Sequence, residues 1–303
     1  MATQNRLMQI KAFYDDRTNT LTYVVFSGAD AVIIDPVLDY EPAASKIWTE
    51  SVRQVIEFIK DNNLKPHYIL ETHPHADHLS GSRLLQRQYP DARIGVSSRI
   101  TEVQKTFKKV FGLSEDFPED GSQFDILLDD NQQFTAGNLS IKVVATPGHT
   151  PACVSYLIGD ALFTGDALFM PDMGTGRCDF PGGSAMDLYQ SIKHGIYSLP
   201  DTTRIFVGHD YQPGGRELDY ETTIAEQKRS NKQLNGTTTL EEFLEFRIAR
   251  DKTLSAPKLL FQSIQVNIDA GSIPKAESGQ RFLKIPLNVF APGEEENLLL
   301  DQI

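Results

Sequence analysis

The chain has 303 residues, of which 40% are apolar and 23% charged, and its formal net charge at pH 7 is −12. These values are typical of an ordinary globular protein with one large domain, or one domain plus an extension. The negative charge excludes non-specific binding to nucleic acid or to an anionic membrane, because both need a positive surface. No apolar run approaches the roughly 20 residues of a membrane-spanning helix, so we expect no membrane association.

The cellular location is inferred from the N-terminal residues and the cysteines. Residues 1–6 contain neither the apolar core of a secretion signal nor an Arg-rich amphipathic helix. The two cysteines, Cys153 and Cys178, lie in no CxxC pair and fit as free thiols in a reducing compartment. We therefore expect a cytoplasmic protein. The sequence leaves its oligomeric state open, and a homo-oligomer is one possibility.

The first quarter of the chain predicts alternating strands and helices. Two β-rich runs, 21–26 and 31–35, are separated by a short turn and indicate a hairpin. Residues 51–62 carry apolar side chains at the spacing of one helical face. The apolar run 68–70 then reads as a buried strand.

Directly after this strand, six residues supply three histidines and an aspartate: His73, His75, Asp77 and His78. Imidazole and carboxylate groups are the ligands that suit zinc, iron and related divalent metals. His73 and His75 are two residues apart, so in extended geometry their side chains point the same way. A His-rich surface loop without metal is the alternative, but it does not account for so many ligand types together. The stretch therefore predicts a metal site on a stiff strand end.

The rest of the chain continues the mixture of helices and strands. The apolar patterns predict helices at 84–89, 103–111 and 240–250, a helix that begins at Ser184 with Asp187 in a capping box, and strands at 93–96, 139–143, 154–158, 161–164 and 204–207. Residues 114–130 are acidic and rich in turn formers, which indicates a surface connection. The acidic end, 291–303, is expected to be mobile.

Three of these later strands also end in a potential metal ligand. His149 follows strand 139–143 after Gly148, Asp166 follows strand 161–164 after Gly165, and His209 follows strand 204–207 after Gly208. Glycine lets the backbone bend sharply and approach other groups closely. Taken singly, each residue has an ordinary interpretation as a turn or loop residue. Their shared position after a strand favours one site at a sheet edge.

Four motifs occur in an order that resembles the metallo-β-lactamase superfamily. They are THPHADH at 72–78, TPGHT at 146–150, TGDALF at 164–169 and GHDY at 208–211. The resemblance covers residues 8–235 and implies an α/β fold, the αββα sandwich of two facing sheets with helices outside and the metal site along one edge. We therefore expect a catalytic domain at 1–235, and a C-terminal helical extension and tail at 236–303 packed on the same domain.

The resemblance implies one of two chemistries. In glyoxalase II and related hydrolases, two metals, zinc among them, cleave a thioester with metal-bound hydroxide. The corresponding ligands here would be His73, His75 and His149 for one metal, Asp77, His78 and His209 for the other, and Asp166 as the bridge. In the persulfide dioxygenases, one Fe(II) per chain is held by His73, His149 and Asp166 alone. Two histidines and one carboxylate leave three positions open on the iron.

Residues outside the ligand set favour the dioxygenase. The segment MGTGRCDF at 173–180 resembles the persulfide dioxygenase pattern G-x-G-R-[TC]-D-F, and His-Asp-Tyr at 209–211 differs from the His-Glu-Tyr of glyoxalase II. The resemblance therefore implies a mononuclear non-haem iron dioxygenase. Its partners would be O₂ and a low-molecular-weight persulfide, most simply glutathione persulfide, which it would convert to sulfite and thiol. A glyoxalase II-like hydrolase is the alternative, and a catalytically silent metal-binding protein is a third interpretation.

Under the dioxygenase interpretation, other residues take supporting roles. Arg177 would bind a substrate carboxylate through its planar fork, with an ion pair to Asp172 or Asp179 as the alternative. Tyr211 would donate a hydrogen bond to oxygen or substrate, with simple packing as the alternative. The flanks of Cys178 give no sign of a depressed pKa, which argues against a nucleophile. The remaining ligand-type residues would orient the iron ligands and carry protons: His75, Asp77, His78 and His209.

Overall fold

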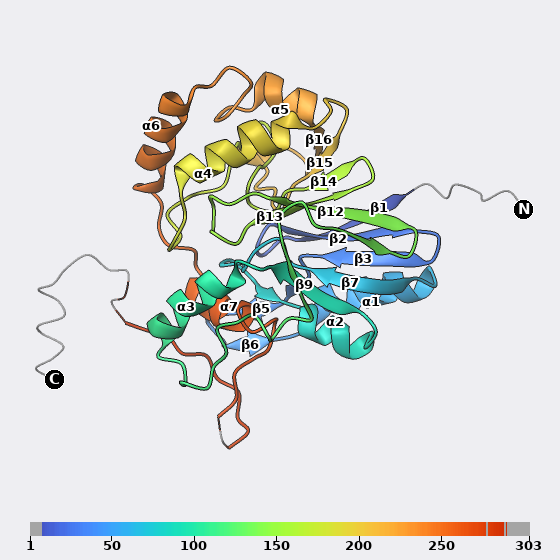
Figure 1. Cartoon of the computed structure of the whole chain (residues 1–303). Helices are drawn as coiled ribbons and strands as arrows, with labels where there is room; N and C mark the ends of the chain where they lie inside the picture. Colours follow the sequence, from blue (N-terminus) through green and yellow to red (C-terminus); the bar gives the residue numbers. More distant parts are fainter. Residues whose placement is uncertain (1–7, 277, 288, 290–303) are drawn as a thin grey trace, which may run out of the picture.

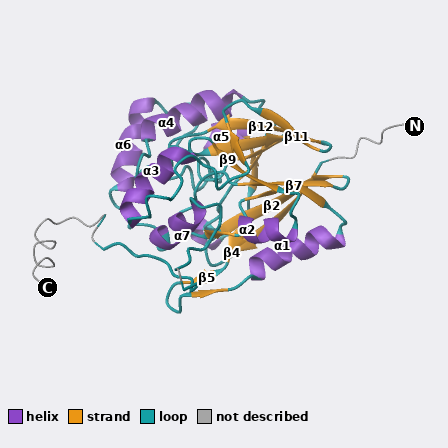
Figure 2. Cartoon of the chain, turned by 60° about the horizontal axis from the view of Figure 1, so that its bottom comes forward, coloured by secondary structure: helices purple, strands orange, loops and turns teal. Residues whose placement is uncertain are grey.

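The structure is a computed structural model that describes residues 8–276, 278–287 and 289. Its strands form two six-stranded sheets that pack face to face, with helices on both outer sides (Figure 1). Figure 1 shows the strands between α4 (Ala185–Gln190) above and α1 (Glu50–Asp61) and α2 (Ser82–Gln88) below, and Figure 2 shows the strands from another side. This is the αββα sandwich that the motifs predict, and the fold class is confirmed.

The two large sheets are built from consecutive parts of the chain. In spatial order, the first contains β1 (Gln9–Asp15), β2 (Thr20–Ser27), β3 (Asp30–Ile34), β7 (Lys65–Leu70), β9 (Arg93–Ser97) and β10 (Ile126–Leu128). The second contains β11 (Gln133–Ala136), β12 (Leu139–Ala145), β13 (Val154–Ile158), β14 (Ala161–Phe163), β15 (Arg204–Phe206) and β16 (Glu221–Thr223). Two small antiparallel pairs join β4 (Val37–Leu38) to β8 (Leu79–Ser80), and β5 (Tyr40–Glu41) to β6 (Lys46–Ile47).

The helices connect strands or extend the sandwich. They are α1 (Glu50–Asp61), α2 (Ser82–Gln88), α3 (Ile100–Phe111), α4 (Ala185–Gln190), α5 (Ile224–Ser230), α6 (Leu240–Asp251) and α7 (Leu260–Asn267). A π-helix at Ser191–Gly195 and 3₁₀-helices at Ile196–Ser198 and Pro213–Gly215 complete the set. In the described part of the chain, no helix is long and apolar enough to cross a membrane.

Strand alternation divides the apolar residues between two cores. In β2, Tyr23 and Val25 face the core between the sheets, while Val24 between them faces the core under α1. Tyr23 packs against Phe163 and Phe206 of the second sheet, with ring centroids 5.1 Å and 5.7 Å apart. Its hydroxyl donates to the carbonyl of Val207 at 2.7 Å. Aromatic packing and a cross-sheet hydrogen bond of Tyr23 therefore help to hold the two sheets together.

The sequence correctly predicts the positions of the hairpin, of helices α1 to α3 and of the strands with a clear apolar pattern. The expected surface connection at 114–130 is partly wrong, because β10 at its end pairs with β9 in parallel. The helix after Ser184 begins as predicted, but only half of the capping box forms: the Ser184 side chain accepts from the Asp187 amide, whereas the Ser184 amide donates to the Gly148 carbonyl. Regular α-helix ends at Gln190. The predicted mobile end, 291–303, lies outside the described residues, and the domain division at 235 stays a prediction.

Candidate metal centre

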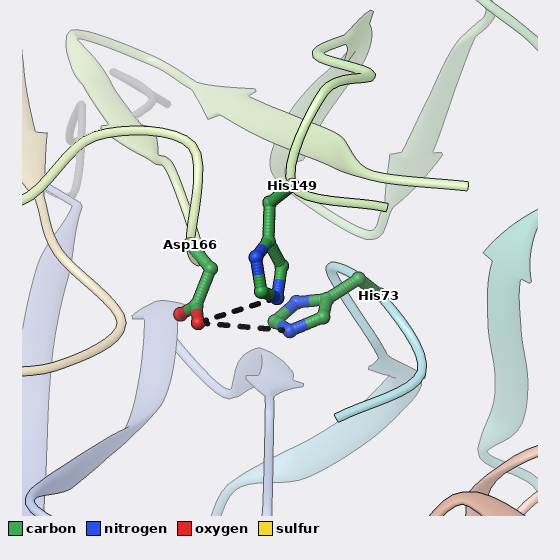
Figure 3. Close-up of side chains that lie close together, drawn as sticks. All are labelled: His73, His149 and Asp166. Carbon is green, nitrogen blue, oxygen red and sulfur yellow. Dashed lines mark ion pairs between the residues drawn. The ribbon is translucent and has the colours of Figure 1, made fainter. Parts of the chain in front are cut away.

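Three strand ends bring His73, His149 and Asp166 together at one edge of the sandwich (Figure 3). His73 follows β7 in the first sheet, whereas the other two follow β12 and β14 in the second. The Asp166 Oδ2 atom lies 3.6 Å from Nε2 of His149 and 4.0 Å from Nε2 of His73. One candidate ligand atom from each residue lies within 4.8 Å of the others, so one ion can contact all three.

The hydrogen bonds around these side chains fit a metal. The Nδ1 atom of His149 donates to the backbone oxygen of Arg177 at 2.7 Å, and Nδ1 of His73 lies 3.0 Å from the Thr72 hydroxyl. Both rings therefore keep Nε2 for the site, as metal-bound histidines do. The His73 Nε2 atom is buried and lacks a hydrogen-bond partner in the described structure. An unsatisfied buried polar atom of this kind requires a missing partner, and a divalent cation supplies one.

Electrostatics also prepare His73 and Asp166 for a cation. Burial, with a smaller contribution from neighbouring His75, lowers the pKa of His73 well below its ordinary value, so the ring is neutral. Burial opposes ionisation of Asp166, but His209 and His73 hold the pKa of this carboxyl well below its usual range. Neutral imidazole and ionised carboxylate are the forms that bind divalent metals.

The loops that carry the ligands are fixed by specific contacts. Asp35 follows β3 and accepts hydrogen bonds from both the amide and the hydroxyl of Thr72 at 2.7 Å. Gly148 has φ 146°, and a Cβ atom there would lie 2.5 Å from the backbone nitrogen of Leu188. No other residue fits this approach, so glycine is required before His149.

His75 belongs to a different cluster. Its Nε2 atom lies 3.0 Å from Asp35 Oδ1 and 3.3 Å from Glu71 Oε2. Although burial disfavours the charged ring, Asp35 and Glu71 raise the pKa of His75 well above its ordinary value. Glu71 itself accepts hydrogen bonds from the hydroxyls of Ser80 and Ser82.

The last three ligand-type residues lie beside the centre without forming one set. His209 has its Nε2 atom 3.2 Å from Asp166 Oδ1 and 3.3 Å from Asp77 Oδ2. Burial lowers the pKa of His209, but these two carboxylates outweigh it and raise the pKa to about 9. His78 keeps a buried Nε2 atom without a partner among the described residues. In that part of the chain, three clusters of candidate ligands form: His73–His149–Asp166, His75–Asp77–His78 and Asp35–Glu71–His75.

Arg177 and Tyr211 both line the cavity over the centre, but they differ in their polar contacts. The Arg177 guanidinium pairs with Asp179 at 2.5 Å and donates to the Ser255 carbonyl at 2.8 Å, which is the alternative considered for it. Tyr211 stacks on the His209 ring, with centroids 5.6 Å apart, and is 42% exposed. Its hydroxyl has no hydrogen-bond partner in the described structure and remains available to a ligand.

The cavity above the centre has a volume of about 590 Å³ and is lined by residues that include His149, Asp166, Arg177, Tyr211 and Lys258. An adjoining cavity of about 530 Å³ shares Asp166, Arg177 and Tyr211 and adds Lys232 and Arg250. Among the described residues neither of these two added cations forms a direct ion pair with a carboxylate, although the charge of Lys232 contributes to lowering the pKa of Asp172. They lie outside every motif, so the sequence offers no local signal for them.

Cys178 is buried next to this region. Burial raises the pKa of its thiol, which is therefore protonated at neutral pH. Its amide donates to Asp251 Oδ2 at 2.9 Å. The thiol is a structural group in this arrangement, in line with the prediction that it is no nucleophile.

Comparison with known proteins agrees with this geometry. A family model described as "Metallo-beta-lactamase superfamily" matches residues 15–209. The chain is 50% identical to "Glyoxylase B2" of Dictyostelium discoideum, over 84% of this chain and 88% of that protein. It is 30% identical to the mitochondrial "Persulfide dioxygenase ETHE1" of Homo sapiens, over 86% of this chain and 88% of that protein.

A solved structure is similar as well. The crystal structure of ETHE1 from Myxococcus xanthus superposes with a TM-score of 0.69 at 32% identity, covering 87% of this chain and all of that one. The family model covers the strands that carry every residue of the centre. The chain therefore belongs to the metallo-β-lactamase superfamily and resembles its persulfide dioxygenase branch.

Proposed function

We propose that this protein is a mononuclear non-haem iron persulfide dioxygenase. The observation that carries the proposal is the set of ligand clusters in the described structure. The trio His73, His149 and Asp166 forms a cluster, whereas the two trios that a dinuclear hydrolase needs, His73–His75–His149 and Asp77–His78–His209, do not. Two histidines and one carboxylate are typical of non-haem Fe(II) oxygenases.

The proposed reaction is RSSH + O₂ + H₂O → RSH + H₂SO₃, in which the terminal sulfur loses four electrons and O₂ gains four. Bound Fe(II) would supply a place where O₂ and the terminal sulfur meet. His73, His149 and Asp166 would hold that ion, and the carbonyl of Arg177 would keep the His149 ring in place. Tyr211 would donate its free hydroxyl to the substrate beside the ion, because it lines the same cavity as Asp166.

The thiol carrier of the proposed substrate is anionic. Arg177 is already paired with Asp179, so it is a weaker candidate for a substrate carboxylate than its sequence position suggests. Lys232 and Arg250 line the adjoining cavity and form no direct ion pair with a carboxylate within the described residues. Glutathione persulfide carries carboxylates that such cations attract. We therefore expect these two residues to affect KM for that substrate.

A second candidate is a glyoxalase II-like hydrolase with two metals. The relative at 50% identity carries the name "Glyoxylase B2", which favours this candidate. All seven ligand-type side chains are also present, and His78, which clusters with His75 and Asp77, keeps a buried Nε2 atom without a partner in the described structure. That nitrogen is able to accept a second ion.

One experiment separates the two candidates. Protein loaded anaerobically with Fe(II) is assayed for oxygen uptake with glutathione persulfide, and a zinc-loaded sample is assayed for cleavage of S-D-lactoylglutathione. Metal content is measured in both. One iron per chain with oxygen uptake supports the dioxygenase. Two metals per chain with thioester cleavage and no oxygen uptake would overturn it, and loss of oxygen uptake in His149→Ala serves as the site control.

A further inference from the structure

A buried asparagine from the far end of the chain holds the ligand loop. Asn267, the last residue of α7, donates through Nδ2 to the backbone oxygens of His75 and His78, both at 2.8 Å. Its Oδ1 atom accepts from the Ser80 amide, also at 2.8 Å. The residue is only 5% exposed, and both donors and the acceptor of its amide are used in these contacts.

The loop depends on this support because it has no regular hydrogen bonds of its own. Between β7 and β8, residues 73–78 make no backbone–backbone hydrogen bond within the described structure. Buried backbone carbonyls that lack such partners must be satisfied by side chains. Asn267 satisfies two of them in a loop that begins with His73. Through these two contacts it holds the backbone of the loop that follows His73.

Helix α7 is itself anchored firmly enough to act as a support. Leu260 and Ile264 are buried in the core that also contains α1 and α3. The Gln104 side chain of α3 donates to the carbonyl of Ile268 at 2.9 Å, directly after Asn267. All of α7 lies beyond residues 15–209, the part that the family model matches. The support therefore comes from outside the part of the chain that carries the ligand motifs.

We infer that Asn267 is a positioning residue of the metal centre, through which the C-terminal helix sets the geometry of the ligand loop. The inference rests on the metal-binding part of the proposed function and not on which metal is bound or which reaction follows. Partners that orient metal ligands typically change metal affinity by about 10–100-fold when they are removed. We expect an effect of that size here.

The same helix offers a matched control. Gln265 is a buried amide two residues earlier and is 2% exposed. Its side chain accepts from the Lys284 amide and donates to the Lys284 carbonyl, both at 2.9 Å, and touches no atom of the ligand loop through a hydrogen bond. Gln265→Ala therefore removes a comparable number of buried hydrogen bonds on α7 without releasing the loop.

The test compares Asn267→Asp, Asn267→Ser and Gln265→Ala with the wild-type chain. Co²⁺ affinity is measured by competition with a chromophoric chelator, and thermal unfolding of the metal-free proteins shows whether each variant folds. Both Asn267 variants are expected to bind Co²⁺ about 10–100-fold more weakly, and Gln265→Ala to bind it as the wild type does. Asn267→Asp keeps the size of the side chain but turns an oxygen toward two carbonyls. Asn267→Ser is smaller and keeps the measurement possible if the aspartate variant does not fold.

Two results would overturn the inference. One is wild-type Co²⁺ affinity in a folded Asn267 variant, and the other is an equal loss in Gln265→Ala. Neither depends on the reaction. If wild-type protein hydrolyses thioesters and takes up no oxygen, the proposed function fails while the role of Asn267 is still decided by the Co²⁺ titration.

Discussion

Replacing Asp251 by asparagine tests how α6 is held against the loop that carries Arg177. The Asp251 Oδ1 atom lies 2.5 Å from Nη2 of Arg247, and the two side chains are only 9% and 3% exposed. The other oxygen accepts from the Cys178 amide. Asparagine keeps the volume but removes the charge, so the Arg247 guanidinium stays buried without a counter-ion.

The magnitude follows from this burial. Breaking a buried ion pair by removing one partner costs about 3–5 kcal/mol, because an uncompensated charge remains in the interior. We expect Asp251→Asn to lower the free energy of unfolding by that amount. The matched control is Glu102→Gln. Glu102 pairs with Arg99 at 2.9 Å, but the two side chains are 49% and 43% exposed. An exposed pair contributes at most about 1 kcal/mol.

The assay is urea unfolding of both variants and the wild type in the presence of a chelator, so that metal binding does not contribute. The free energies are compared at equal slope against urea concentration, which shows that the unfolded states are alike. If Asp251→Asn loses no more stability than Glu102→Gln, the buried pair does not hold α6 as described, and the reasoning from burial is refuted.

Three further predictions address stability and the site. Burial raises the pKa of Asp269 from 3.8 to about 6, so the folded state loses stability as the pH rises from 4 to 6. Asp269→Asn should therefore unfold at the wild-type temperature at pH 3.5 and be more stable than the wild type at pH 8 by about 1–2 kcal/mol. Two pKa units correspond to ~3 kcal/mol, and partial exposure of the side chain reduces this value. Equal thermal stability at pH 8 would contradict this. A Cβ at Gly176 would collide with the backbone oxygen of Asp166, whereas one at Gly195 meets open space. Gly176→Ala should lower the free energy of unfolding by about 1–3 kcal/mol and Gly195→Ala should leave it unchanged, as measured by urea unfolding. Tyr211→Phe should lower kcat for oxygen uptake by about 10²-fold while metal content stays unchanged, and an unchanged kcat would remove Tyr211 from the reaction.

Local patterns predict much of this fold. The hairpin of β2 and β3, the amphipathic helix α1 and the strands before each ligand are encoded in short periodic runs, and the structure contains them. The strand β10 escaped prediction because it has three residues, Ile126–Leu128, and exists through its pairing with β9. The end of α4 at Gln190 escaped for a similar reason, since the apolar spacing continues through the π-helix that follows.

The residues of the site also fall into two groups, those that local sequence signals predict and those that they do not. A dense motif and glycine-preceded strand ends are local signals, and they point to the residues that cluster around Asp166. The state of Arg177 depends on which carboxylate its loop brings near, and Asp172 instead pairs with Arg216 at 2.6 Å. Asn267 lies in an ordinary apolar run. Its role comes from a hydrogen bond to a loop 189 residues earlier in the chain. The spacing of residues along the sequence cannot predict such a distant contact.

The late position of α7 has a consequence for how the protein matures. Translation runs from the N-terminus, and domains generally begin to fold in that order. His73, His149 and Asp166 are all synthesised well before Asn267. Until Asn267 is synthesised, the ligand loop lacks the side-chain amide that donates hydrogen bonds to its backbone carbonyls. A nascent chain that stops short of α7 should therefore capture metal poorly, and tight loading of the ion belongs to the completed polypeptide.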